Sequence, residues 1–97
     1  MVQAAPNKTD LEGVVTSQSP HPQTPGFDQL TVLLERATPV DGFAELLSPR
    51  VGAAIEVLAA HDRVPVGVVG KHIRFRGTLA GPGVVRLDPT MPVLVTP

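Results

Sequence analysis

Hydrophobic and polar positions change their spacing twice along this chain, at about residue 25 and again after Arg63. Up to residue 25 the apolar residues show little periodicity, and four prolines occur in the segment, at positions 6, 20, 22 and 25. Proline fixes φ and removes a backbone donor. Residues 1–24 are therefore predicted to form an extended, proline-rich arm that is disordered unless something binds it.

The predicted arm contains one short apolar cluster, formed by Leu11, Val14 and Val15. These side chains are candidate anchors that attach the arm to a neighbouring protein chain. The alternative is that the arm is a solubilising tail, and composition alone does not distinguish the two roles.

A first helix is predicted over residues 25–37. Thr24-Pro25 is typical of a helix N-cap followed by proline at the first helical position. Apolar residues recur at helical spacing, at Phe27, Leu30, Leu33, Leu34 and Ala37. The run from Leu30 to Leu34 also suits a strand, but the length of the segment and its capping signals favour a helix.

Two further helical segments are predicted, a short turn over 41–47 that begins at Asp41 and a full helix over 49–61. Ser48-Pro49 repeats the pattern of a cap followed by proline. The segment after it is apolar on nearly all sides.

A helix with an apolar circumference is normally buried on most sides. Glu56 is the only charge between Arg50 and His61, and a small domain offers few elements to cover such a helix. Part of its surface is therefore expected to contact another chain, and the candidate interface residues are Ala53, Val57 and Ala60. The alternative is a helix of small residues that lies flat on its own sheet.

After Arg63, β-branched residues and glycines dominate the sequence. Strands are predicted over residues 64–69, 71–79, 84–88 and 93–96. The second of them alternates almost strictly between apolar and polar residues, and a turn over Ala80–Gly83 joins it to the third as an antiparallel hairpin. The expected register places Arg74 opposite Asp88 and Arg76 opposite Arg86.

The last predicted strand is flanked by Pro92 and Pro97, which suits an edge strand or a strand added to a partner's sheet. Val93 and Val95 are the candidate interface residues here. Taken together, the pattern predicts an α+β fold. The arm precedes a compact domain over 25–97, in which two helices and a helical turn pack on a small antiparallel sheet.

Charge is distributed unevenly along the 97 residues, although the net charge is only −1. Residues 1–62 hold eight acids and three bases, whereas residues 63–97 hold five bases and one acid. The bases on the hairpin define a candidate basic surface of His72, Arg74, Arg76 and Arg86. Such asymmetry suits either nucleic acid or contact with the acidic half of a neighbouring molecule, and we favour the second reading.

Catalytic and metal-binding patterns are not recognisable. The three histidines have no ligand spacing, and neighbouring helical residues such as His61 and Asp62 point in different directions. No serine has the setting of a nucleophile, and Gly67–Lys71 lacks two residues of a phosphate-binding loop. The chain is therefore predicted to be no enzyme, with no cofactor, no metal and no small-molecule substrate.

The sequence has no cysteine, no apolar run of about 18 residues and no signal-peptide pattern. It therefore predicts a protein without a membrane partner, not secreted by a signal peptide, in the cytoplasm or within a virion or other large particle. The favoured function is a structural or assembly subunit, a homo-oligomer or part of a larger assembly, that contacts neighbouring chains through the arm, the apolar helix and the edge strand. The less favoured hypothesis is a winged-helix nucleic-acid-binding regulator that uses the basic hairpin.

Overall fold

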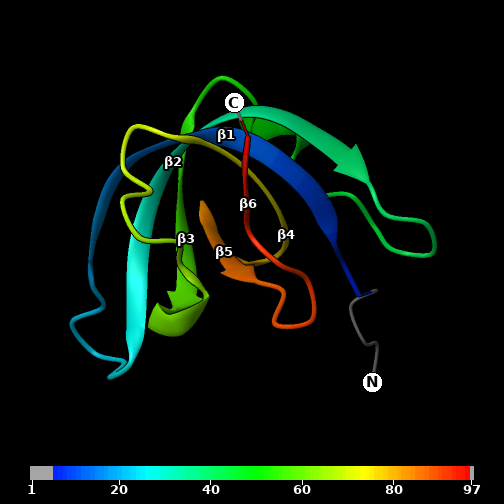
Figure 1. The fold of residues 1–97 in the computed structure, drawn as a ribbon. Helices are drawn as coiled ribbons and strands as arrows, with labels where there is room; N and C mark the ends of the chain where they lie inside the picture. The colour runs from blue at the N-terminus through cyan, green and yellow to red at the C-terminus, as the bar shows by residue number, and fades with distance from the viewer. Residues whose placement is uncertain (1–5, 97) are drawn as a thin grey trace.

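The computed structural model describes residues 6–96, which form a small closed β-barrel (Figure 1). These residues contain no α-helix and only two short 3-10 helices, η1 (Ser48–Arg50) and η2 (His61–Arg63). The strands are β1 (Thr9–Pro20), β2 (Phe27–Pro39), β3 (Ala54–Ala60), β4 (His72–Gly81), β5 (Val84–Leu87) and β6 (Leu94–Thr96). The predicted α+β fold, with helices over 25–37, 41–47 and 49–61, is therefore wrong.

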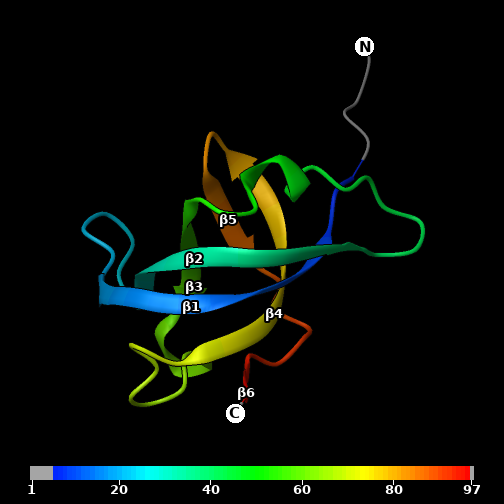
Figure 2. The same cartoon turned by 90° about the horizontal axis from the view of Figure 1, so that it is seen from above.

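The barrel closes because β1 pairs with two neighbours at once. The strand order is β1-β2-β3-β5-β4, and β4 pairs back onto β1. All of these pairs are antiparallel except β3 with β5, which is parallel. β6 pairs with the first residues of β4. Figure 2 shows β1 and β2 side by side, with the β1–β2 loop at one end and the β2–β3 loop at the other.

β1 is a strand, not an arm, because its residues alternate between the inside and the outside of the barrel. The buried positions of its first half are Thr9, Leu11, Gly13 and Val15. Leu11 pairs with Ala37 of β2 and with Phe75 of β4. The arm prediction is thus wrong from Thr9 onward, and residues 1–5 of it lie outside the described residues.

β2 and β3 occupy two of the segments that were predicted as helices. Leu30 and Leu34 fit both a helical and a strand period, but Val32 shares their buried face only in a strand. In β3, buried Ile55 and Val57 flank the exposed Glu56. The apolar composition of this segment reflects a strand with apolar residues on both faces, not a buried helix.

Loops close the two ends of the barrel with apolar side chains. The β2–β3 loop places Leu47 in the core, and the β3–β4 loop places Val64 and Val68 there, at the opposite end of β3. The second loop is held by a main-chain hydrogen bond of 2.7 Å from Gly70 N to Val15 O. Residues 64–69, predicted as a strand, therefore form part of a closing loop. Within the described residues, no helix is long and apolar enough to cross a membrane.

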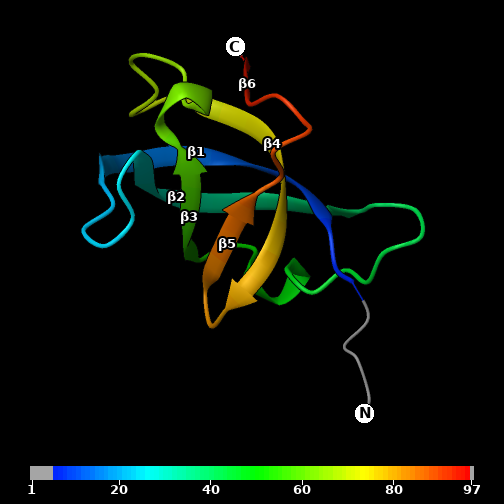
Figure 3. The same cartoon turned by 90° about the horizontal axis from the view of Figure 1, so that it is seen from below.

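β4, β5 and β6 occupy segments where alternation predicted strands, but the register of the β4–β5 hairpin differs from the expected one. β4 continues to Gly81 and confines the turn to Pro82 and Gly83. Thr78 therefore lies opposite Arg86, and the repulsive pairing of Arg76 with Arg86 does not occur. Figure 3 shows β3, β5 and β4 side by side in this part of the barrel.

A buried carboxylate at the end of β5 ties the start of the chain to the C-terminal segment. Asp88 Oδ1 accepts hydrogen bonds from Thr90 N at 2.8 Å and Thr90 Oγ1 at 2.6 Å. Its Oδ2 accepts no hydrogen bond from the described residues, and its counter-charge is Lys8 Nζ at 3.2 Å. Hydrogen bonds from Thr90, helped by the nearby Lys8, lower the pKa of Asp88 to about 2 although burial opposes them.

Replacing this carboxylate should destabilise the barrel in a pH-dependent way. The folded pKa lies below the unfolded value, so the stabilisation is present above about pH 4 and is lost as the pH falls towards about 2. We expect Asp88→Asn to lower the free energy of unfolding by about 2 kcal/mol at pH 7, and by progressively less below pH 4. Urea titrations at several pH values measure this, with Asp41→Asn as an exposed control. An unchanged difference down to about pH 2 would contradict it.

Candidate binding face

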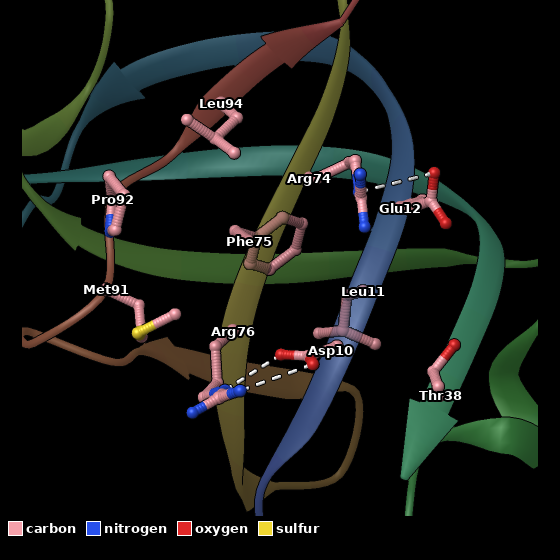
Figure 4. Close-up of a pocket in the computed structure, with 10 residues that line it drawn as sticks. All are labelled: Asp10, Leu11, Glu12, Thr38, Arg74, Phe75, Arg76, Met91, Pro92 and Leu94. Atoms are coloured by element: carbon pink, nitrogen blue, oxygen red, sulfur yellow. Dashed lines mark hydrogen bonds and ion pairs between the residues drawn. The ribbon is translucent and has the colours of Figure 1, made fainter. Parts of the chain in front are cut away.

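Two hollows on the outer surface of the described residues are relevant to binding. The first, of about 230 Å³, is the charged groove, which lies between β1, β4 and the segment that leads into β6 (Figure 4). Its lining residues are Asp10, Leu11, Glu12, Thr38, Arg74, Phe75, Arg76, Met91, Pro92 and Leu94.

The arginines of the charged groove are paired within the chain. Arg76 donates two hydrogen bonds to Asp10, from Nε at 2.8 Å and from Nη2 at 3.3 Å, and Arg74 Nε lies 3.8 Å from Glu12 Oε1. The hydrogen bonds to Asp10 raise the pKa of Arg76. These arginines are therefore engaged by the acids of β1, which the sequence analysis placed in a separate arm.

The candidate basic surface is thus divided. His72 also has an acidic partner, because its Nε2 lies 2.9 Å from Glu35 Oε1 and its Nδ1 contacts Thr96 Oγ1. Arg86 points outward from β5, level with Leu58 of β3. It therefore belongs to a different surface from the other three.

The second hollow, the apolar groove, has a volume of about 200 Å³ and lies over β2, β3 and β5. Its lining residues are Phe27, Leu58, Ala60, Arg63, Arg86, Leu87 and Pro89. Phe27 pairs with Ala60 across β2 and β3, which places its half-buried ring at one end of the outer surface of these strands. We call this outer surface of β2, β3 and β5 the β2–β3–β5 face.

Three of the six arginines form no ion pair within residues 6–96, namely Arg50, Arg63 and Arg86. Arg86 and Arg63 line the apolar groove. Arg50 Nη1 lies beside Gly83 of the β4–β5 loop, 3.8 Å from where a Cβ on that residue would stand. The arginines without an acidic partner therefore follow the line of β3 and β5.

A histidine and a buried aspartate stand at the Phe27 end of the β2–β3–β5 face. His61 Nδ1 lies 2.7 Å from Asp28 Oδ2, and Gln18 Nε2 donates to the same oxygen at 2.8 Å. These two hydrogen bonds lower the pKa of Asp28 against the opposing effect of its burial. Sequence spacing suggests only Asp62 as a partner of His61, because Asp28 lies 33 residues away and comes close through the pairing of β2 with β3.

The residues predicted as protein contacts are scattered over the barrel. Leu11, Val15 and Val57 are at most 1% exposed in the core, so they are not available to another chain in the folded barrel. Val14 is partly buried on β1, Val93 packs against the core, and Ala60 lines the apolar groove. Ala53 and Val95 are exposed, and their contact with a partner stays a prediction.

No three His, Asp or Glu side chains gather as a metal site within residues 6–96.

Comparisons with protein-family models, with curated proteins and with solved structures find no match for this chain. A fold alone does not give a function, so the side chains on the β2–β3–β5 face must carry the argument for function.

Proposed function

We propose that this chain is a non-enzymatic binding module that holds single-stranded nucleic acid on its β2–β3–β5 face. The observation that carries the proposal is the line of three arginines without acidic partners beside an apolar groove that contains Phe27. The winged-helix form of this hypothesis required a recognition helix, and the described residues contain no such helix.

The chemistry of the face suits a polyanion with flat apolar bases. Single strands bind where cationic side chains follow the backbone and an aromatic ring stacks on a base. Phe27 and Leu58 offer the apolar surface, while Arg63 and Arg86 stand on the same groove. Gln29 and Thr31 are partly exposed on the outer side of β2 and add hydrogen-bonding groups.

The arginines also succeed one another along the strands. Gly83, beside Arg50, accepts a hydrogen bond from Glu56 N at 2.9 Å, Arg86 is level with Leu58, and Arg63 follows Ala60 by three residues. At about 3.3 Å per residue, Glu56 and Ala60 are about 13 Å apart. This length is sufficient for several consecutive phosphates of a single strand to lie beside the three arginines. The carboxylate of Glu56 lies nearer to the Arg50 end of this line than to the Arg63 end.

Assembly through protein contacts, the function favoured from the sequence, has less support from the geometry. The arm and the apolar helix on which it depended are strands of the barrel. The remaining element is β6, whose three residues are preceded by Pro92, and short strands next to proline are a common protection against edge pairing. Binding to a protein through Ala53 or Val95 stays a prediction.

Charge reversal on the face tests the proposal. We expect a fluorescent oligothymidylate of about 15 nucleotides to bind the parent chain, and Arg86→Glu or Arg63→Glu to weaken binding roughly tenfold and to reduce its salt dependence. Fluorescence anisotropy between about 50 and 200 mM salt measures both effects. Arg36→Glu is the matched control, because Arg36 lies near the far end of β2, its side chain is 71% exposed and its contact with Glu12 is 3.7 Å long.

Removal of the ring separates stacking from charge. Phe27→Ala should weaken binding by about 5- to 150-fold while it leaves the salt dependence unchanged, because base stacking on an aromatic side chain contributes about 1–3 kcal/mol. No binding of the oligonucleotide, equal losses in Arg36→Glu and Arg86→Glu, or tighter binding of an acidic peptide would overturn the proposed function.

A further inference from the structure

His61 extends the set of charged side chains at the end of the β2–β3–β5 face. It begins η2 directly after Ala60 and stands two residues before Arg63, and both of these residues line the apolar groove. Its backbone N donates to Gly26 O at 2.9 Å, which fixes the start of η2 against the β1–β2 loop beside Phe27. The main chain therefore fixes His61 between two residues of the groove lining, while its ring contacts Asp28.

The ring of His61 is oriented by Asp28 and remains open to solvent. Nδ1 is engaged by the carboxylate at 2.7 Å, whereas the side chain is 74% exposed and Nε2 has no hydrogen bond to the described residues. Asp28 is itself fixed, since its side chain is only 6% exposed and Gln18 donates to the oxygen that His61 contacts. A carboxylate held in this way keeps the second ring nitrogen directed away from β2.

Protonation of His61 changes the charge that a phosphate would meet here. With a neutral ring, the pair of Asp28 and His61 carries a net charge of −1, and with a protonated ring it carries none. Asp62 and Arg63 follow His61 in η2, and Gln18 of β1 shares Asp28 Oδ2 with the ring. His21 of the β1–β2 loop donates from its backbone N to Phe27 O, next to Asp28. When Asp62 and Arg63 are counted as well, protonation of the ring changes the net charge of these four groups from −1 to zero.

We propose that His61 is a proton-dependent phosphate contact, which makes the β2–β3–β5 face bind single strands more tightly as the pH falls. The inference rests on the proposed function. Among the side chains of proteins, histidine is the one that ordinarily changes its charge between about pH 8 and pH 5. Nε2 of the protonated ring then donates a charge-assisted hydrogen bond to a phosphate oxygen.

The test measures the affinity of the same labelled oligothymidylate between about pH 8 and pH 5.5 at constant ionic strength. The parent chain should gain roughly fivefold in affinity, as expected for one solvent-exposed ionic contact. His61→Gln keeps a donor for Asp28 and should bind as the parent does at pH 8, with no gain at pH 5.5. His72→Gln and His21→Gln should keep the gain, and circular dichroism at each pH checks that every variant is folded.

The outcomes separate this inference from the proposed function. Suppose that the oligonucleotide binds and that Arg86→Glu weakens its binding. If the affinity of the parent chain is then independent of pH, or if His61→Gln keeps the pH dependence, His61 is not the contact and the proposed function stands. If His21→Gln, and not His61→Gln, abolishes the gain in affinity at low pH, the inference is overturned in the same way. If nothing binds at any pH, both proposals are wrong.

Discussion

Removal of residues 1–23 is expected to abolish the cooperative thermal unfolding transition of this protein. The deletion removes all of β1, which pairs with β2 on one side and with β4 on the other. It also removes Leu11 and Val15 from the core, and each such side chain contributes about 1.5–3 kcal/mol when fully buried. Since a domain is stable by only about 5–15 kcal/mol, the remaining strands should not form a closed barrel.

Calorimetry or circular dichroism of the truncated chain measures this effect. Deletion of residues 1–5 is the control, because it retains β1 and the other strands of the barrel. If residues 1–24 formed a disordered arm, removal of residues 1–23 would leave the midpoint nearly unchanged. A midpoint within a few degrees of the parent for the longer deletion would therefore show that β1 does not close the barrel in solution.

Replacing Gly13 by alanine is expected to be the most destabilising conservative substitution in β1. A Cβ at this position would stand 2.3 Å from the main-chain oxygen of Leu33 and 2.8 Å from Val32 Cγ1. Because the nearer atom belongs to the backbone, the two strands must separate locally and lose ladder hydrogen bonds. We expect the free energy of unfolding to fall by about 3 kcal/mol or more.

Alanine substitutions at two other glycines provide a comparison for the loss of stability expected in Gly13→Ala. A Cβ at Gly77 would meet a side-chain atom, Val85 Cγ1, at 2.4 Å, and a rotation of that side chain can relieve the contact. Gly81 has no atom within 4 Å of the same position. Urea titrations should therefore rank the losses as Gly13→Ala, then Gly77→Ala, then Gly81→Ala, and an equal effect in all three would contradict the close approach of β1 and β2.

The N-terminal half of the fold was not predictable from the spacing of apolar residues alone. Leu30 and Leu34 satisfy a helical period as well as a strand period, and Thr24-Pro25 resembles a helix start although the segment is a loop before β2. In β3, Leu58 and Ala60 on the outer face conceal the alternation that Ile55 and Val57 define. By contrast, the clear alternation of apolar and polar residues over 71–79 predicted a strand where β4 is observed.

The binding face was less predictable still, because its residues come from segments that are far apart in the sequence. Arg76 and its partner Asp10 are 66 residues apart, so their ion pair follows only from the register of β4 with β1. Without that register, Arg74, Arg76 and Arg86 look like one basic patch. Phe27 was assigned to a helix core, and its place on an outer surface follows from the pairing with Ala60.

The pairing of β1 with β4 also sets the order in which this protein can mature during synthesis. Thr9 pairs with Gly77, so the first strand to leave the ribosome waits for β4 before both of its edges are satisfied. Until then, a hairpin of β1 and β2 exposes the edge of β1 that pairs with β4 in the barrel, together with the apolar side chains of Leu11 and Val15. A second nascent chain offers the same β4 sequence, so this unpaired edge is the place where an exchange of strands between two copies would begin.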